Sequence, residues 1–473
     1  MTFKMTINGV EIDGTEAFDV INPATGEAFA KAPDCTESEL DLAVKSARAA
    51  QTAWKNMPIE NRKACIQAFA GKIAEQGAEL ARLLTTEQGK PFEDAMGDVM
   101  GGAYWLSETC KYDLPEHTIE ETEERRAVTK YEAIGVVAGL VPWNFPIILA
   151  CFKIAPALLA GNTMVLKPAP TTPLTTLKLG QIAQEVFPAG VFNVISGSDR
   201  LGPWLTSHPG IDKVSFTGST QTGKRVMESA APSLKRLTLE LGGNDAAIIM
   251  PDVDVDQVAK NLFWAAFRNS GQICIATKRM YIHEDVYEPI KAAIVEYAAT
   301  IKVGDGAEQG TQIGPVQNEK QYKVVLDLIA DAKKNGYKFL IGGETSNAPG
   351  YFIPITILDN PPETARIVQE EQFGPILPLL KFDDLETVID KANATEFGLG
   401  ASVWTDDLDL ADKVANALEA GTIWINETQY LSPHGAFGGW KQSGIGVEGA
   451  EHGLMEFTRP KTVFTRFKPA PVS

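Results

Sequence analysis

Residues 136–167 read VVAGLVPWNFPIILACFKIAPALLAGNTMVLK, and this stretch decides the fold. Two short apolar runs, 136–140 and 163–167, are bounded by Gly, Pro or Asn and carry no charge before the terminal Lys167. Runs of this length and composition predict buried strands. Residues 147–159 between them predict a buried helix, preceded by a turn at 142–146. The stretch therefore predicts strand, turn, helix, strand.

The alternation continues along the chain. We predict strands at 191–195, 213–216 and 236–241, with helices ending near residues 186 and 229; Thr172-Pro173 is typical of a helix start. Alternating units of this kind predict a parallel sheet with helices on both faces and ligands beyond the carboxyl ends of its strands. A second α/β run spans about 277–425, with strands near Met280, Phe339, Ile353, Leu377 and Ile423.

Three further elements are predicted outside these runs. Thr36 and Glu39 form a capping box before an amphipathic helix, and residues 60–84 predict a second helix. Residues 115–133 predict an exposed, charged hairpin, and 462–467 a last strand. A projecting hairpin leaves strand edges that favour pairing with another subunit, so we expect a homodimer or homotetramer.

The composition excludes several kinds of partner. The 473 residues carry a net charge of −18 without a basic cluster, which argues against nucleic acid and anionic membrane surfaces. Residues 133–152 lack formal charges and are long enough to span a bilayer, but Pro142 and Pro146 would interrupt a spanning helix. We therefore expect no membrane association.

The cysteines indicate a reducing compartment. There are five, scattered and without a CxxC pair, and the five histidines show no metal-ligand spacing. This pattern argues against a disulfide framework and against a metal site, and it favours a cytoplasmic protein. The first fourteen residues lack the apolar core of a secretory signal.

One cysteine stands in an unusual setting. Residues 267–276 read FRNSGQICIA, with Cys274 after a Gly-Gln pair and beyond the end of an apolar helical pattern. A free cysteine is usually a small buried packing residue. Here Gly271 frees the backbone to turn and Gln272 is polar, so we predict that Cys274 lies on a turn and is a nucleophile rather than core.

The decapeptide resembles the cysteine signature of the aldehyde dehydrogenase superfamily. Residues 239–244 (LELGGN) resemble its glutamate signature, and 142–146 (PWNFP) the segment carrying its oxyanion asparagine. Family-like segments run from about 21 to 464. The resemblance implies an α/β fold with three parts: a variant Rossmann cofactor domain (1–114 and 134–243, with 444–460 packing back on it), an α/β catalytic domain (244–443), and a small β oligomerisation element (115–133 and 461–473).

The resemblance also implies catalytic roles. Cys274 would attack the aldehyde, Asn144 and the Cys274 N–H would hold the oxyanion, and Glu240 would activate the water that hydrolyses the thioester. Lys153 matches a family lysine that assists proton transfer; alternatively, it only extends from its apolar helix toward water. A retained Glu240 favours release of a free acid over transfer to coenzyme A.

The cofactor would be NAD or NADP. Residues 218–224 fit the spacing of a phosphate-binding loop, but Arg225 stands where a nucleotide hydrolase needs Ser or Thr. The resemblance instead makes this loop a dinucleotide site. It implies cofactor contacts from Val141, Trp143, Lys167, Gly218, Ser219, Leu241, Glu371 and Phe373. Many NAD-preferring members carry Glu where this chain has Pro170, so both cofactors remain open.

The expected substrate is an apolar aliphatic or aromatic aldehyde. Family positions that line the substrate tunnel are all apolar here: Phe145, Leu149, Phe152, Ile273, Ile275 and Phe437. A semialdehyde carboxylate would need a cation, which this set lacks. Two alternatives remain, a semialdehyde dehydrogenase of the same family and a non-catalytic relative on the same scaffold.

Overall fold

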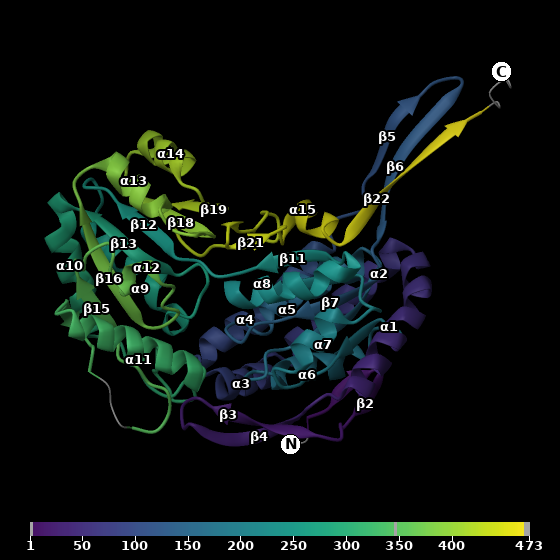
Figure 1. Cartoon of the computed structure of the whole chain (residues 1–473), viewed down its shortest axis with the longest axis horizontal. Helices are drawn as coiled ribbons and strands as arrows, with labels where there is room; N and C mark the ends of the chain where they lie inside the picture. Colours follow the sequence, from purple (N-terminus) through teal and green to yellow (C-terminus); the bar gives the residue numbers. More distant parts are fainter. Residues whose placement is uncertain (1–2, 345–347, 468–473) are drawn as a thin grey trace.

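The computed structural model describes residues 3–344 and 348–467. Two large sheets stand next to each other, each flanked by helices, and a narrow three-stranded sheet projects from one end (Figure 1). The predicted hairpin and last strand form this projection. Residues 468–473 of the predicted oligomerisation element lie outside the described residues.

The first sheet contains the stretch 136–167 and has a parallel centre. Its strand order is β2-β1-β9-β8-β7-β10-β11-β21, and the pairs from β9 to β11 are all parallel. The strands are β1 (Met5–Ile7), β2 (Val10–Ile12), β7 (Val136–Leu140), β8 (Thr163–Lys167), β9 (Phe192–Val194), β10 (Lys213–Thr217), β11 (Arg236–Glu240) and β21 (Gly444–Ile445). All residues of β7, β8 and β10 are buried, as the apolar runs predict.

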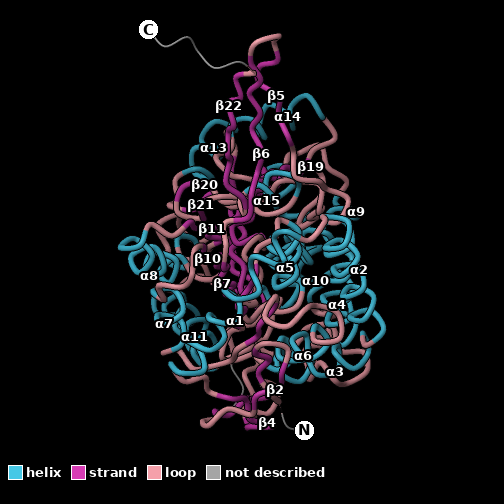
Figure 2. The backbone as a smooth tube through the Cα atoms, turned by 90° about the vertical axis from the view of Figure 1, so that its right-hand side faces the viewer, coloured by secondary structure: helices cyan, strands magenta, loops and turns pink. Residues whose placement is uncertain are grey.

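Helices cover both faces of the first sheet. Seen from the side, α7 and α8 lie on one face and α2 to α6 on the other (Figure 2). The helices are α1 (Glu37–Asn56), α2 (Ile59–Glu75), α3 (Gly77–Gln88), α4 (Phe92–Thr109), α5 (Ile148–Leu159), α6 (Leu174–Ala183), α7 (Leu201–Ser207) and α8 (Thr220–Ala230). The predicted capping box at the start of α1 is present.

Two helix predictions were wrong. Residues 60–84 form two helices, because the chain leaves helical geometry at Gln76 (φ −94°, ψ 11°). Thr172 does not cap α6, which starts after Pro173 and ends at Ala183. The carboxylate of Glu87, from α3, accepts the backbone N–H groups of Leu174 and Thr175 instead, at 2.7 and 2.9 Å.

The second sheet follows after two glycines. Its order is β14-β15-β16-β13-β12-β18-β19, and only the edge pair β14–β15 is antiparallel. The strands are β12 (Asp245–Ile249), β13 (Thr277–His283), β14 (Lys338–Ile341), β15 (Thr356–Asp359), β16 (Ile376–Phe382), β18 (Gly400–Trp404) and β19 (Thr422–Ile425). The prediction missed β12 and β18. It also placed a strand near Ile353, whereas β15 begins at Thr356.

The remaining helices and strands complete the two bodies and the projection. The helices are α9 (Val255–Phe267), α10 (Glu284–Ala298), α11 (Glu319–Lys334), α12 (Arg366–Gln369), α13 (Leu385–Asn393), α14 (Leu408–Ala417) and α15 (Ala450–Met455). Short strand pairs are β3 (Ala17–Asn22) with β4 (Glu27–Pro33), and β17 (Phe397–Gly398) with β20 (Trp440–Lys441).

The projecting sheet, here called the arm, joins distant parts of the chain. It consists of β5 (Glu116–Glu121), β6 (Arg125–Ala133) and β22 (Thr458–Arg466), with β6 in the centre. The last strand therefore begins four residues before the predicted position and pairs along its whole length with β6. Among the described residues, no helix combines the length and the apolar character needed to cross a membrane.

Candidate active site

Cys274 lies on a tight turn, as predicted. The chain leaves α9, passes through the short helix η2 (Arg268–Gly271) and turns before β13. Asn269, Ser270 and Gly271 all have positive φ angles, of 51°, 58° and 71°. A side chain on Gly271 would place its Cβ 2.2 Å from the carbonyl oxygen of Gly374, so only glycine fits.

The surroundings of Cys274 favour the neutral thiol over the charged thiolate. Burial raises the pKa of this thiol to about 12; Lys278 opposes this shift, while the carboxylates of Asp245, Glu371 and Glu240 add to it. The thiol is therefore protonated in this structure at neutral pH, and its activation requires a base.

Asn144 is held against the loop that carries Cys274. Its Nδ2 donates to the carbonyl oxygen of Gln272 at 3.0 Å, and its own backbone carbonyl accepts from Asn269 Nδ2 at 3.2 Å. The same carbonyl accepts from Lys90 Nζ at 2.9 Å, and Lys90 also pairs with buried Asp98. Among the described residues the Asn144 Nδ2 donates only to Gln272, so its second amide hydrogen can donate to a ligand oxygen at the loop that carries Cys274.

Glu240 ends β11, at the crossing between the two sheets. Its side chain is buried, and neither carboxylate oxygen has a hydrogen-bond partner among the described residues. Burial raises its pKa well above the usual carboxyl range, and the charge of Glu448 adds to this shift. A buried carboxyl without partners is costly, so this position points to chemical use rather than to packing.

Lys153 forms a buried ion pair that the sequence did not reveal. Its Nζ donates to Glu448 Oε1 and to Thr217 Oγ1, both at 2.7 Å, and its side chain is fully buried. The alternative that Lys153 extends toward water is therefore wrong. Glu448 is the only acidic residue in the glycine-rich run 437–449, which was a usable signal.

Several predicted cofactor residues lie at the carboxyl edge of the first sheet. Val141 N donates to the carbonyl of Lys167 at 3.0 Å, and Gly218 N donates to that of Glu240 at 3.0 Å. Ser219 caps α8 by accepting from Thr222 N. Burial lowers the pKa of the Lys167 ammonium to about 8. The start of α8 therefore offers backbone N–H groups to an anion, and Lys167 ends β8 at the same edge of the sheet.

Other predicted cofactor residues meet across the seam between the sheets. The rings of Trp143 and Phe373 meet edge to face, with centroids 5.2 Å apart. Glu371 Oε1 accepts from Gly243 N at 3.1 Å. Leu241 is buried and its N–H donates to the carbonyl of Ser443 at 2.8 Å.

Four of the six predicted substrate residues surround Cys274. Ile273, Ile275 and Phe437 form a buried apolar cluster with half-buried Phe145 packed against it. The prediction did not include four other members of this cluster, Ala276, Leu399, Trp424 and Leu431. The remaining two lie on α5: Leu149 packs against the first core, and Phe152 is buried under the ring of Trp105 at 3.6 Å.

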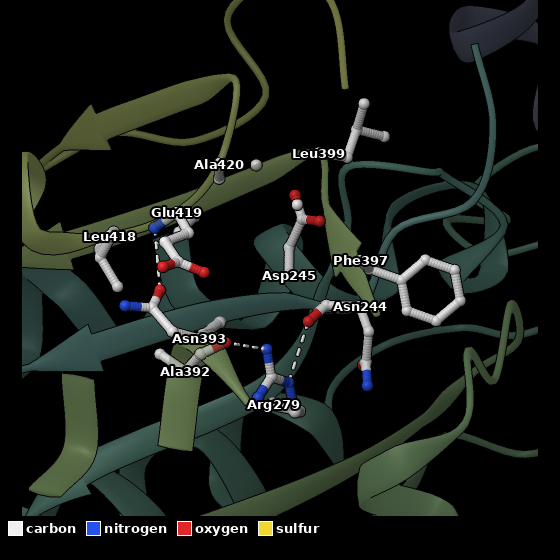
Figure 3. Close-up of a pocket in the computed structure, with 14 residues that line it drawn as sticks. Asn244, Asp245, Arg279, Ala392, Asn393, Phe397, Leu399, Leu418, Glu419 and Ala420 are labelled. Carbon is white, nitrogen blue, oxygen red and sulfur yellow. Dashed lines mark hydrogen bonds between the residues drawn. The ribbon is translucent and has the colours of Figure 1, made fainter. Parts of the chain in front are cut away.

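A small polar cavity of about 20 Å³ lies at the start of β12 (Figure 3). Asn244, Asp245 and Arg279 line it, and Arg279 donates to the carbonyls of Asn244 and Ala392. The buried carboxylate of Asp245 has no partner side chain among the described residues, and burial raises its pKa to about 7. The cavity has room for about one water molecule, so it is not a substrate site.

The described residues contain no group of three or more His, Cys, Asp or Glu side chains that could hold a metal ion.

Known proteins share both the sequence and the fold. The model of the aldehyde dehydrogenase family matches residues 10–463. A putative aldehyde dehydrogenase of Gibberella fujikuroi is 41% identical, covering 98% of each chain. Two solved structures are each 37% identical. An NAD⁺ complex of aldehyde dehydrogenase from Bacillus cereus has a TM-score of 0.97 and covers 99% of this chain and 97% of that chain. An E. coli NADP-dependent enzyme has a TM-score of 0.96, with 98% and 99% covered.

These matches confirm the resemblance drawn from the three motifs and the fold class it implies. The model and the relative each span nearly the whole chain, and both solved structures superimpose on nearly all of it. The chain belongs to the aldehyde dehydrogenase family and is an NAD(P)-dependent oxidoreductase that oxidises aldehydes.

Proposed function

We propose that the protein oxidises an uncharged aldehyde to the free carboxylic acid through a covalent intermediate on Cys274. The observation that carries this proposal is the meeting of Cys274, Asn144 and Glu240 at one seam. Solvent water acts as the base that takes the proton of the Cys274 thiol, and the resulting thiolate adds to the carbonyl carbon. The oxygen of the resulting thiohemiacetal accepts hydrogen bonds from Asn144 Nδ2 and the Cys274 N–H. Loss of a hydride from this adduct leaves a thioester.

Glu240 then acts as the general base. Its carboxylate takes a proton from water, the hydroxide adds to the thioester carbon, and the Cys274 sulfur leaves. A carboxylate with a raised pKa and no hydrogen-bond partner among the described residues suits this role, because its oxygens can accept from water and it binds a proton more strongly than an exposed carboxylate does. We further propose that Lys153 assists proton movement between Glu240 and Glu448. Lys153 forms an ion pair with Glu448, and its charge also acts on Glu240.

The cofactor fits the carboxyl edge of the first sheet. The start of α8 with Gly218 and Ser219 would hold the pyrophosphate, Lys167 the adenosine ribose and Glu371 the nicotinamide ribose. When bound, NAD or NADP supplies the ring that accepts the hydride. Val141, Trp143, Leu241 and Phe373 border the same seam, so we keep the proposed division into a cofactor domain and a catalytic domain at residues 243/244.

The surroundings of Cys274 favour an apolar substrate. The cluster around the thiol consists of aliphatic and aromatic side chains, and Trp424, Leu399 and Leu431 extend that character beyond the predicted set. Lys278, whose charge acts on the thiol, donates to three backbone carbonyls and is not free to pair with a substrate carboxylate. Lys90, over the ring of Phe145, is paired with Asp98. We therefore favour an aliphatic or aromatic aldehyde over a semialdehyde.

The arm supports assembly into a homodimer or homotetramer. Its side chains Ile119, Val463 and Phe464 are exposed, and Phe464 is 70% exposed. The outer edges of β5 and β22 carry unpaired backbone groups among the described residues. Such an apolar surface with open edges is expected to be covered by a second copy. The five free cysteines fit a reducing compartment, which we propose is the cytoplasm.

A steady-state assay tests the proposal. Aliphatic, aromatic and carboxylate-bearing aldehydes are offered with NAD or NADP, and formation of reduced cofactor is followed by absorbance. We expect the highest kcat/KM with an uncharged aldehyde and one molecule of acid per molecule of reduced cofactor. Preference for a semialdehyde would contradict the proposed substrate class, and no turnover with any aldehyde would contradict the catalytic role.

A further inference from the structure

Lys278 is a buried lysine whose three donors all point at the loop that carries Cys274. Its Nζ donates to the carbonyl oxygens of Ile273 at 2.9 Å, Cys274 at 2.7 Å and Ala276 at 3.2 Å. Its side chain is 3% exposed. An ammonium group has three N–H bonds, so this residue is committed to one four-residue segment of backbone.

The contact with Ile273 fixes the peptide group that supplies the Cys274 N–H. In a trans peptide the carbonyl and the N–H point in opposite directions, so holding the Ile273 oxygen toward Lys278 turns the Cys274 N–H away from it. Hydrogen bonding at the carbonyl also polarises the N–H of the same peptide group. Ala276 N donates to the same Ile273 oxygen at 3.0 Å and closes the turn.

The same ammonium group faces the proposed nicotinamide-ribose carboxylate. Lys278 Nζ lies 3.9 Å from Glu371 Oε1, which is anchored by the N–H of Gly243. The Cys274 thiol and the Glu371 carboxyl are both half-buried beside this cation, and its charge favours the ionised form of each. Asp245 and Glu240 are the other charged groups facing the thiol, and both oppose its ionisation.

We propose that Lys278 is a positioning residue that aims the Cys274 N–H at the oxyanion and links the nucleophile loop to the carboxylate of Glu371. The inference rests on the proposed roles of Cys274 and Glu371. Lys278 touches neither aldehyde nor cofactor in this arrangement; it acts through the loop and through its charge. Two effects follow. The charge of Lys278 stabilises the Cys274 thiolate, and a cofactor that contacts Glu371 changes, through Lys278, the electrostatic surroundings of that thiolate.

The test separates the charge of Lys278 from its hydrogen bonds. Lys278→Met removes both, and Lys278→Gln retains donors without charge. The pH dependence of Cys274 alkylation by iodoacetamide reports the thiol pKa, and kcat with saturating aldehyde reports the oxyanion contact. We expect both variants to shift the alkylation midpoint upward and to slow alkylation at pH 8 by about tenfold, one pKa unit. We expect Met to lower kcat by about tenfold to a hundredfold, and Gln by less.

A matched control is Lys213→Met. Lys213 is also buried, but it is the first residue of β10 and so lies at the amino ends of the parallel strands, away from the proposed site at their carboxyl ends. It donates to Thr238 Oγ1 at 2.6 Å. We expect it to leave the alkylation profile unchanged. Glu371→Gln should lower the midpoint pH of Cys274 alkylation, because the Glu371 carboxylate no longer competes with the thiolate for the charge of Lys278. In the Lys278→Gln background this competition is already absent, so the same substitution should lower the midpoint by less.

The outcomes distinguish this inference from the proposed function. An unchanged alkylation midpoint in a folded Lys278→Gln protein, with Cys274→Ala inactive, would overturn the role of Lys278 alone. Activity retained in Cys274→Ala would overturn the proposed function. If Lys278→Met fails to fold, as judged by circular dichroism, Lys278→Gln and Glu371→Gln decide the question.

Discussion

Cys274 and Glu240 face the same seam but are held in opposite ways. The Cys274 loop is fixed from all sides: Asn144 and Lys278 bond its carbonyls, and three consecutive positive φ angles define its entry. The Glu240 carboxylate ends a regular strand and makes no hydrogen bond within the described residues.

The difference matches the tasks of the two residues. A nucleophile that must present both its sulfur and its N–H to one carbon benefits from a loop with a single geometry. A base that must take a proton from a mobile water benefits from free oxygens. The cost of leaving them free is expressed in the raised pKa of Glu240.

Removing the sulfur should have the largest effect. Cys274→Ala eliminates the atom that forms the covalent intermediate, so we expect kcat to fall by about 10⁴-fold or more. Cofactor binding, measured by quenching of tryptophan fluorescence, should stay within about threefold. Measurable steady-state turnover above 1% of the parent would show that another group is the nucleophile.

Removing the base should leave the first half of the reaction intact. Glu240→Gln is expected to lower steady-state turnover by about 10²–10⁴-fold, while a rapid-mixing experiment still shows one equivalent of reduced cofactor per site. Loss of that burst together with turnover would mean that Glu240 is also needed to activate Cys274.

The pH profile should report Glu240 in the parent protein. The base works as a carboxylate, and burial raises its pKa, so kcat should rise with pH through a midpoint well above the usual carboxyl range. Lys153 favours the ionised form, so Lys153→Met should move this midpoint to higher pH and lower kcat at pH 7 by about tenfold. A midpoint that does not move would separate Lys153 from the base.

A carboxylate in place of Pro170 should change the preference between NAD and NADP without altering Cys274 or Glu240. Pro170→Glu places a negative charge near Lys167, where it would repel a 2′-phosphate. We expect kcat/KM with NADP to fall by about tenfold or more and that with NAD by less than about threefold. Pro170→Gln is the uncharged control. Equal losses with both cofactors would indicate a general disturbance of the site.

The smallest effect on chemistry should come from the arm. Phe464→Glu puts a charge on the exposed apolar surface of β22, a strand that projects from the body of the molecule (Figure 1). We expect light scattering to show a smaller assembly, with kcat changed by less than about twofold when measured on the remaining assembled fraction. An unchanged mass would place the subunit contact elsewhere.

The central parallel strands could be predicted because their signal is local. Strands β7, β8 and β10 are uninterrupted buried runs, and each prediction lies within one residue of the observed ends. Strands β12 and β18 were missed because they are short and open with residues of low strand propensity: β12 begins Asp-Ala-Ala and β18 begins Gly-Ala-Ser.

The wrong start of α6 and the unforeseen Lys153–Glu448 pair have another physical cause: the deciding partner is distant in sequence. Thr172-Pro173 looks like a helix cap, but Glu87 takes that role across 87 residues. Likewise, the seam residues Cys274, Glu240 and Asn144 were identified by their motifs, whereas the Lys153–Glu448 pair spans 295 positions. Its one local sign was Glu448, the only acidic residue in the run 437–449. Lys278 was not distinguished from a surface lysine, because its acceptors are backbone atoms, which sequence does not display.

The strand that carries Glu240 is completed late. On one side β11 pairs with β10, but on the other it pairs with β21, so Glu240 is opposite Gly444. A ribosome makes the chain from its amino end, so every strand of both sheets except β21 emerges before the residue that closes this edge. A nascent or truncated chain that ends at residue 443 would contain Cys274, but the edge of β11 next to Glu240 would have no partner strand. Completion of synthesis thus precedes completion of the catalytic seam.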